Sequence, residues 1–191
     1  MPKLGMEPIR RSALVEATIA EIGAAHSLDV TVGQIAKRAG MSSALAHHYF
    51  GGKDEIFLAA MRHILAEFGG IVRLRLASAA GPRARAAAII EASFDETCFT
   101  PATINAWMTF YATALTSKPT HRLLRLYQRR LRSNLIHALR PVSADPLQDA
   151  ELLAALIDGL YLRAALCARA TAADARLQAL NALDLVLDRA S

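Results

Sequence analysis

The chain of 191 residues contains few cysteines, and this scarcity limits the chemistry open to it. Cys98 and Cys167 lie far apart, and neither belongs to a CxxC motif or to a cluster of cysteine and histidine. Structural zinc sites and disulfide frameworks need closely spaced or numerous cysteines. We therefore expect two reduced thiols packed as small hydrophobic side chains, with no metal site and no redox role.

Long apolar stretches are also absent, although 53% of the residues are hydrophobic. No apolar stretch reaches the roughly 18 uncharged residues that a membrane span needs, and Met1–Gly5 lacks the apolar core of a signal peptide. We expect a cytoplasmic protein that does not contact a membrane. Phosphate-binding glycine loops, HExxH and GxSxG motifs are missing too, so the sequence predicts neither an enzyme nor a cofactor.

Glycine (10) and proline (7) are scarce, whereas alanine, the best helix former, occurs 39 times. Glycine, proline and capping residues divide the chain into about nine helical runs, without strand-like alternation. The sequence therefore predicts an all-α fold. The expected helices cover about 7–25, 31–39, 42–50 and 53–76, which Gly69-Gly70 could disturb, then begin near Pro82, Pro101, Pro119, Pro146 (ending near Ala170) and Ala173.

Residues 31–50, TVGQIAKRAGMSSALAHHYF, are typical of a helix-turn-helix. Ala36 is small enough for two short helices to cross closely, and Gly40 tolerates the positive φ of a sharp turn. The second helix is too short to be stable alone and would present itself to the major groove of DNA as a probe. An ordinary helical hairpin is the alternative. The small core would comprise Ile35, Ala39, Met41, Ala46 and Tyr49.

The string IAKRAGMS and the extension YFGGK (49–53) resemble the N-terminal domain of TetR-family transcriptional repressors over roughly residues 9–55. The resemblance implies that the probe helix enters the major groove and that Lys53 contacts phosphate. It implies further phosphate contacts from Thr31, Ser42 and Tyr49, and a DNA-facing surface formed by Ser43, Ala44, His47 and His48. Adjacent helical residues point about 100° apart, so we do not expect the two histidines to share a metal ion.

Two positions of the probe helix depart from the family pattern. Ala46 occupies a place that usually carries a large aliphatic residue, and His47 occupies that of a tyrosine, which implies an altered probe surface.

The net charge of +5 suits a nucleic-acid binder, but its distribution does not follow the helix-turn-helix. Residues 1–62 hold seven Lys/Arg against six Asp/Glu, whereas residues 73–140 hold eleven against three. The surplus of positive charge therefore lies outside the segment that we assign to DNA.

Four later strings, SFDET (93–97), AWMTFYA (106–112), RRLRSNL (129–135) and AALIDGLYLRAAL (154–166), and the opening MPKLGMEPIRR, resemble the betaine-pathway branch of the same family. The resemblance implies a repressor of choline uptake and of choline oxidation to glycine betaine, in osmoprotection, with choline as inducer. We divide the chain into a DNA-binding domain, 1–53, and a ligand-sensing and dimerisation domain, 54–191.

Choline is a quaternary ammonium ion that aromatic faces and a nearby carboxylate can hold. The candidate ligand-binding residues are Phe94 and Asp95 on the expected fifth helix, Trp107, Phe110 and Tyr111 on one side of the sixth, and Asp158 and Tyr161 on the eighth. The alternative is that these aromatics are simply core. Asp158 lies in an apolar run and needs a partner, which is either the ligand or one of Arg129, Arg130 and Arg163.

The last two expected helices carry more apolar surface than one sensor core can cover, so we expect a homodimer through a four-helix interface. Its two probe helices would meet an inverted-repeat operator. The alternatives are a TetR-like repressor of another ligand (a drug, an amine or an acyl compound) and an all-helical interaction protein without a DNA role. One apolar face of each helix would pack the sensor core and the remaining apolar surface would form the interface; the apolar residues shared between the two are Leu153, Leu156, Ile157, Leu160, Ala164, Leu177, Leu180, Leu183 and Leu187.

Overall fold

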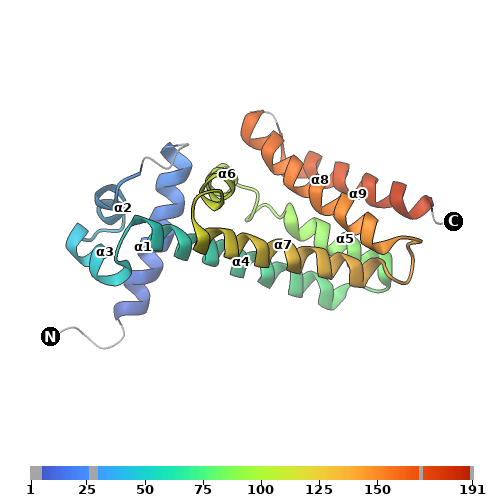
Figure 1. Cartoon of the computed structure of the whole chain (residues 1–191), viewed down its shortest axis with the longest axis horizontal. Helices are drawn as coiled ribbons and strands as arrows, with labels where there is room; N and C mark the ends of the chain where they lie inside the picture. The colour runs from blue at the N-terminus through green and yellow to red at the C-terminus, as the bar shows by residue number, and fades with distance from the viewer. Residues whose placement is uncertain (1–5, 26–29, 168–169, 190–191) are drawn as a thin grey trace.

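The computed structural model describes residues 6–25, 30–167 and 170–189, which form nine α-helices and no strand (Figure 1). This confirms the all-α prediction. In chain order the helices are α1 (Met6–Ala25), α2 (Val32–Arg38), α3 (Ser43–Phe50), α4 (Lys53–Ser78), α5 (Pro82–Ser93), α6 (Pro101–Ala114), α7 (Lys118–Leu139), α8 (Pro146–Leu166) and α9 (Ala172–Asp188).

Side-chain caps set most of the helix starts. The side chains of Thr31, Ser42, Thr100, Ser117, Asp145 and Thr171 each accept a hydrogen bond from a backbone N–H of the first helical turn. Proline at the first or second position of α5, α6, α7 and α8 fixes φ without the loss of a hydrogen bond.

Three details differ from the sequence prediction. Helix α4 runs unbroken through Gly69-Gly70 to Ser78, because the buried residues Ile64 and Val72 anchor it on both sides. Helix α8 ends at Leu166 rather than near Ala170. Phe94 is the C-cap of α5, and Asp95 lies in the turn beyond it, so neither residue belongs to the helix where we expected them.

The helices share one hydrophobic core. Its buried side chains run from Leu14 in α1 to Val186 in α9. Helices α1, α2 and α3 gather at one end of the molecule, and α4 leaves that end to run beside α7 (Figure 1). Since α4 begins at Lys53 and its buried face joins this continuous core, a domain boundary at residues 53/54 stays a prediction. Within the described segments, none of the helices is sufficiently long and apolar to cross a membrane.

Helix α6 crosses α1 at very short range. A Cβ atom added at Gly23 would lie 2.5 Å from Cβ and 2.6 Å from Cα of Ala102. The side-chain amide of Asn105 donates a hydrogen bond to the Gly23 carbonyl at 3.2 Å. Only glycine therefore allows this approach. The contact joins α1, which lies at the same end of the molecule as α3, to α6, which carries Trp107.

Substitution of Gly23 tests the importance of this crossing. We expect Gly23→Ala to lower the free energy of unfolding by about 1–3 kcal/mol, because the added methyl group meets backbone rather than a flexible side chain. Gly69→Ala is the matched control, since its Cβ would make only ordinary contact with Arg73 and should raise helix stability by about 0.5–1 kcal/mol. Urea denaturation of both variants gives the comparison, and an unchanged Gly23→Ala midpoint would contradict the close crossing.

Candidate functional site

The turn between α2 and α3 has the geometry of a helix-turn-helix. Gly40 adopts a φ of 67°, and its N–H donates to the carbonyl of Lys37 at 3.1 Å. The N–H of Met41 donates to the carbonyl of Ala36 at 2.8 Å. Ile35, Ala36 and Ala46 are buried, while Ala39, Met41 and Tyr49 pack partly buried against them. The expected small core is therefore present.

The candidate DNA-contacting residues of helix α3 lie on one exposed face of that helix. Ser43, Ala44, His47 and His48 are exposed, and Tyr49 is half-buried. Ser42 caps α3 by accepting from Leu45 N, and Thr31 caps α2 in a capping box with Gln34. Thr31 and Ser42 are themselves exposed, so both remain beside the surface that α3 presents.

His47 is held in one tautomer by its own helix end. Its Nδ1 lies 2.7 Å from the carbonyl oxygen of Gly51. A carbonyl only accepts hydrogen bonds, so Nδ1 carries a proton and donates it. The other ring nitrogen, Nε2, is then an acceptor in that tautomer, and it could meet an N–H donor on a base edge.

Arg10 and Arg11, which sequence reasoning missed, lie beside the end of α3. An Nη1 of Arg10 donates to the Tyr49 hydroxyl at 3.3 Å. The guanidinium of Arg11 lies 5.0 Å from the centre of the Phe50 ring and 5.7 Å from that of Tyr49, within cation–π range. The basic pair in the first turns of α1 was the available signal, but sequence alone did not place it next to Tyr49.

The candidate ligand-binding aromatics meet around Trp107. Its ring centre lies 5.6 Å from those of Phe110 and Tyr111 and 6.0 Å from that of Tyr161. The nearest ring is Tyr127 of α7, at 4.7 Å. Sequence reasoning missed Tyr127: it follows the helical period of the buried side chains of α7, and that period carries no sign that it reaches Trp107. We call Trp107, Phe110, Tyr111, Tyr127 and Tyr161 the aromatic cluster.

Asp158 is the carboxylate that contacts the aromatic cluster. The Tyr111 hydroxyl donates to its Oδ1 at 2.9 Å, so its partner is a tyrosine rather than Arg129, Arg130 or Arg163. Burial raises the pKa of Asp158 above 3.8, and the hydrogen bond from Tyr111 opposes that shift. Burial, and then the charge of Asp158, raise the pKa of Tyr111, so the tyrosine keeps its proton.

Asp95 forms an ion pair with Arg75 instead of contacting the aromatic cluster. The Arg75 guanidinium donates to its Oδ2 at 2.7 Å, and Thr97 donates to its Oδ1 from both backbone and side chain. These bonds, that of Arg75 foremost, lower the pKa of Asp95, so it is an ion-paired carboxylate. Phe94 is buried and stacks on Tyr161, whose hydroxyl donates to the Ser93 carbonyl at 2.7 Å.

A cavity of about 410 Å³ between α7 and α8 opens beside Asp158. It is lined by Asp158, Ala154 and Ala155 from α8 and by Leu131, Arg125 and Arg129 from α7, among others. We call it the α7–α8 cavity. A small molecule in this cavity would reach the carboxylate of Asp158 from solvent. The aromatic cluster lies on the other side of this carboxylate, which Tyr111 contacts.

Known protein families match both the N-terminal and the C-terminal part of the chain. Residues 14–60 match the model of bacterial regulatory proteins of the tetR family, and residues 82–188 match the C-terminal model of BetI-type transcriptional repressors. The chain is 52% identical over 172 residues to the HTH-type transcriptional regulator BetI of Brucella anthropi, covering 89% of each chain. It is 48% identical over 165 residues to BetI of Agrobacterium fabrum, covering 85% of this chain and 80% of the relative.

Solved structures share the fold. A transcriptional regulator from Pseudomonas aeruginosa PAO1 superposes with a TM-score of 0.80 at 26% identity, covering 95% of this chain and 91% of its own. A transcriptional regulator from Saccharomonospora viridis, solved in complex with choline, gives 0.79 at 19% identity, covering 91% and 95%. The chain thus belongs to the TetR family of transcriptional regulators, as a ligand-responsive repressor of the BetI type rather than an enzyme.

Proposed function

We propose that this protein represses genes for choline uptake and for the conversion of choline to glycine betaine, and that choline releases it from its operator. The observation that carries the proposal is Asp158, a carboxylate hydrogen-bonded to a member of the aromatic cluster and reached through the α7–α8 cavity. A fold neighbour that was solved with choline supports the same ligand class.

The ligand would meet Asp158 first and the rings next. Trp107 and Tyr127, with ring centres 4.7 Å apart, leave no space between them for a trimethylammonium group. The rings of Trp107 and Tyr111 are also close, with centres 5.6 Å apart. Choline bound against Asp158 would therefore have to spread these rings to gain cation–π contact. Each such face contributes roughly 0.5–2 kcal/mol, which together with one charge pair suits a metabolite sensor.

Movement of these rings would reach the DNA-binding end through α6. Trp107 and Tyr111 belong to α6, and Ala102 and Asn105 of the same helix contact Gly23 of α1. Helix α4, which follows α3 directly in the chain and runs into the sensor, offers a second path. A coupling of about 1–3 kcal/mol, a 5–150-fold change in operator affinity, is enough for regulation.

Operator recognition is assigned to α3 and its neighbours. Ser43, Ala44, His47 and His48 would meet base edges or phosphates, and Thr31, Ser42, Tyr49 and Lys53 would contact phosphate. To these we add Arg10 and Arg11, because their contacts with Tyr49 and Phe50 hold both guanidinium groups beside α3.

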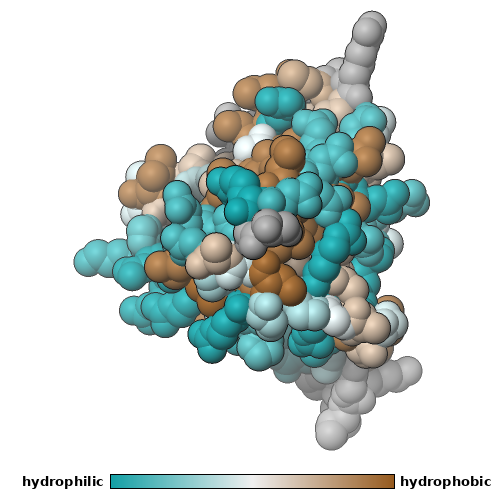
Figure 2. All heavy atoms as spheres, turned by 90° about the vertical axis from the view of Figure 1, so that its right-hand side faces the viewer, coloured by the Kyte–Doolittle hydropathy of each residue, from teal (hydrophilic) through white to brown (hydrophobic). Residues whose placement is uncertain are grey.

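A homodimer is the assembly we propose, through α8 and α9. Leu166 and Leu177 on these helices are 76% and 58% exposed, and Leu152, Leu162 and Leu185 are exposed as well. Viewed from the end where α9 finishes, hydrophobic side chains emerge between hydrophilic ones (Figure 2). A four-helix interface would cover exposed leucines that one chain leaves in water.

The dimer is tested by charge at this face. We expect the double variant Leu166→Glu, Leu177→Glu to sediment as a monomer at micromolar concentration, because carboxylates cannot be buried unpaired in an apolar interface. Leu74→Glu is the control, since Leu74 on α4 is 74% exposed and lies on neither helix. A monomeric parent protein, or a double variant that stays dimeric, would contradict the assignment.

The DNA contacts are tested by salt dependence. We expect Arg11→Gln and Lys53→Gln to weaken binding to operator and random duplexes alike and to flatten the slope of log affinity against log salt by about one phosphate contact each. Arg140→Gln, at an exposed position at the end of α7 and on neither helix of the proposed interface, should change neither quantity. Replacement of Ser43 or Ala44 should instead alter sequence preference. Loss confined to the operator in Arg11→Gln or Lys53→Gln would show a base-reading role instead.

The ligand is tested at Asp158 by calorimetry. We expect Asp158→Asn to weaken choline binding by at least about tenfold, because one charge-assisted contact is lost. Binding of the uncharged isostere 3,3-dimethylbutan-1-ol should change little. An Asp158→Asn protein that binds choline as the parent does would overturn the proposed site.

The pH dependence of choline binding gives a further readout of Asp158. Choline needs the ionised carboxylate, so its affinity should fall as the pH drops through the pKa of Asp158. Because burial raises that pKa above 3.8, the fall should begin at a higher pH than for an ordinary aspartate. Asp158→Asn should abolish this dependence, and an identical pH profile in both proteins would assign it to another group.

A further inference from the structure

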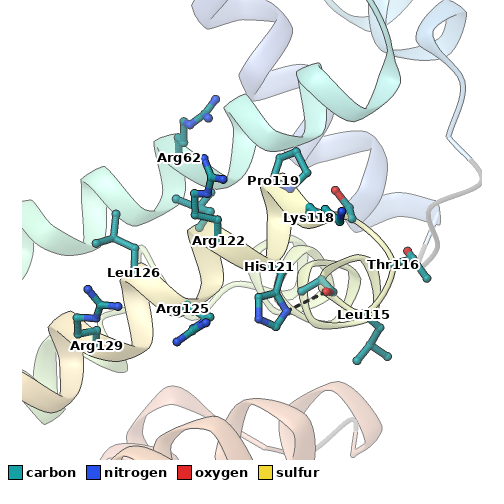
Figure 3. A pocket seen from close by; sticks show the side chains of 13 residues that line it. Arg62, Leu115, Thr116, Lys118, Pro119, His121, Arg122, Arg125, Leu126 and Arg129 are labelled. Atoms are coloured by element: carbon teal, nitrogen blue, oxygen red, sulfur yellow. Dashed lines mark hydrogen bonds between the residues drawn. The ribbon is translucent and has the colours of Figure 1, made fainter.

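A second cavity, of about 940 Å³, lies where α4, the end of α6 and the first half of α7 meet. Its cationic lining comprises Arg62, Lys118, Arg122, Arg125 and Arg129, and the imidazole of His121 lies among them (Figure 3). We call this cavity the basic groove. Leucines are interspersed with these cations: Leu115 is 87% exposed and Leu126 is 42% exposed.

The charges of the basic groove are not balanced within the described part of the chain. No acidic side chain lines it, and none of its four arginines makes an ion pair with a described carboxylate. Some arginines elsewhere do form ion pairs, such as Arg75 with Glu91 and Asp95, and Arg83 with Asp184. Several like charges gathered without counter-charges repel one another, and an anion bound among them would relieve that repulsion.

The apolar lining specifies what kind of anion fits. Inorganic phosphate would satisfy the arginines but would leave Leu115 and Leu126 in water. The basic groove also offers no carboxylate to a quaternary ammonium such as choline, whereas Asp158 and Glu151 line the α7–α8 cavity. The volume is within the range of sites that hold organic ligands, roughly 300–1,000 Å³. We propose that the basic groove binds a small organic anion with an apolar body, such as an aryl or alkyl chain that ends in a carboxylate, sulfonate or phosphate.

The position of the basic groove gives this site a role in regulation. Arg62 belongs to α4, which begins at Lys53 next to the probe helix, whereas Arg122 belongs to α7. The two side chains extend to the same side of the groove (Figure 3). His121 lies 3.3 Å from the Ala114 carbonyl, which links the first turns of α7 to the end of α6. An anion held by Arg62 and Arg122 would therefore join α4 to α7 and change operator affinity independently of choline.

The test uses a matched pair of fluorescent probes on the full-length protein. 8-Anilinonaphthalene-1-sulfonate has an apolar body and one sulfonate, and N-phenyl-1-naphthylamine has the same body without it. We expect the sulfonate to bind once per chain, to be displaced by decanoate but not by decanol or choline, and to weaken operator binding in an anisotropy titration. Arg62→Gln with Arg122→Gln should weaken sulfonate binding by at least about tenfold, because two charge-assisted contacts are lost.

The control is the double variant Arg140→Gln, Arg176→Gln, which loses two positive charges at exposed positions outside the basic groove. This variant should bind the sulfonate as the parent protein does. Equal binding in both double variants, or equal affinity for the sulfonate and the neutral probe, would overturn the proposal. A third outcome would also overturn it. If the Arg62, Arg122 variant bound the sulfonate as the parent does but bound random DNA more weakly and with a flatter salt slope, the groove would be a DNA-binding surface. The choline response is not needed for any of these results, so the two proposals fail separately.

Discussion

The absence of a side chain at Gly23 is the constraint on which the arrangement of the molecule depends. It lets α6 pack against the backbone of α1, with Ala102 and Asn105 in direct contact. Helix α1 packs in turn against α2 and α4, while α6 carries Trp107 into the centre of the sensor. Any shift of α6 larger than a few tenths of an ångström must therefore move α1, because close-packed backbones cannot absorb it.

The sequence was most informative where local chemistry decides the structure. Thr100-Pro101 and Asp145-Pro146 predicted the starts of α6 and α8, and Gly40 predicted the helix-turn-helix, because caps, proline and positive φ act within a few residues. The partners of Asp158 and Asp95 were not predictable in this way. Helical period places Asp158 on a face of α8, but only the crossing of α6 and α8 decides that Tyr111, rather than an arginine, meets it.

Two charge environments lie close together along α7. In the α7–α8 cavity the half-buried carboxylate of Asp158 favours a cation, and in the basic groove the unbalanced arginines favour an anion. Arg125 and Arg129 line both. Lys118, Arg122, Arg125 and Arg129, which line the basic groove, thus give part of the surplus of positive charge in residues 73–140 a defined place in the fold. A repressor built in this way could respond to two metabolites of opposite charge through different helices.

The central claim is that choline acts by moving the rings around Trp107, and the intrinsic fluorescence of the protein tests it most directly. Trp107 is the single tryptophan of the chain, so its emission reports on the aromatic cluster alone. The account predicts a saturable change of emission with choline whose midpoint, measured with operator present, coincides with that of operator release. Operator release by choline without any change in the emission of Trp107 would contradict it, because the ligand would then act from another place.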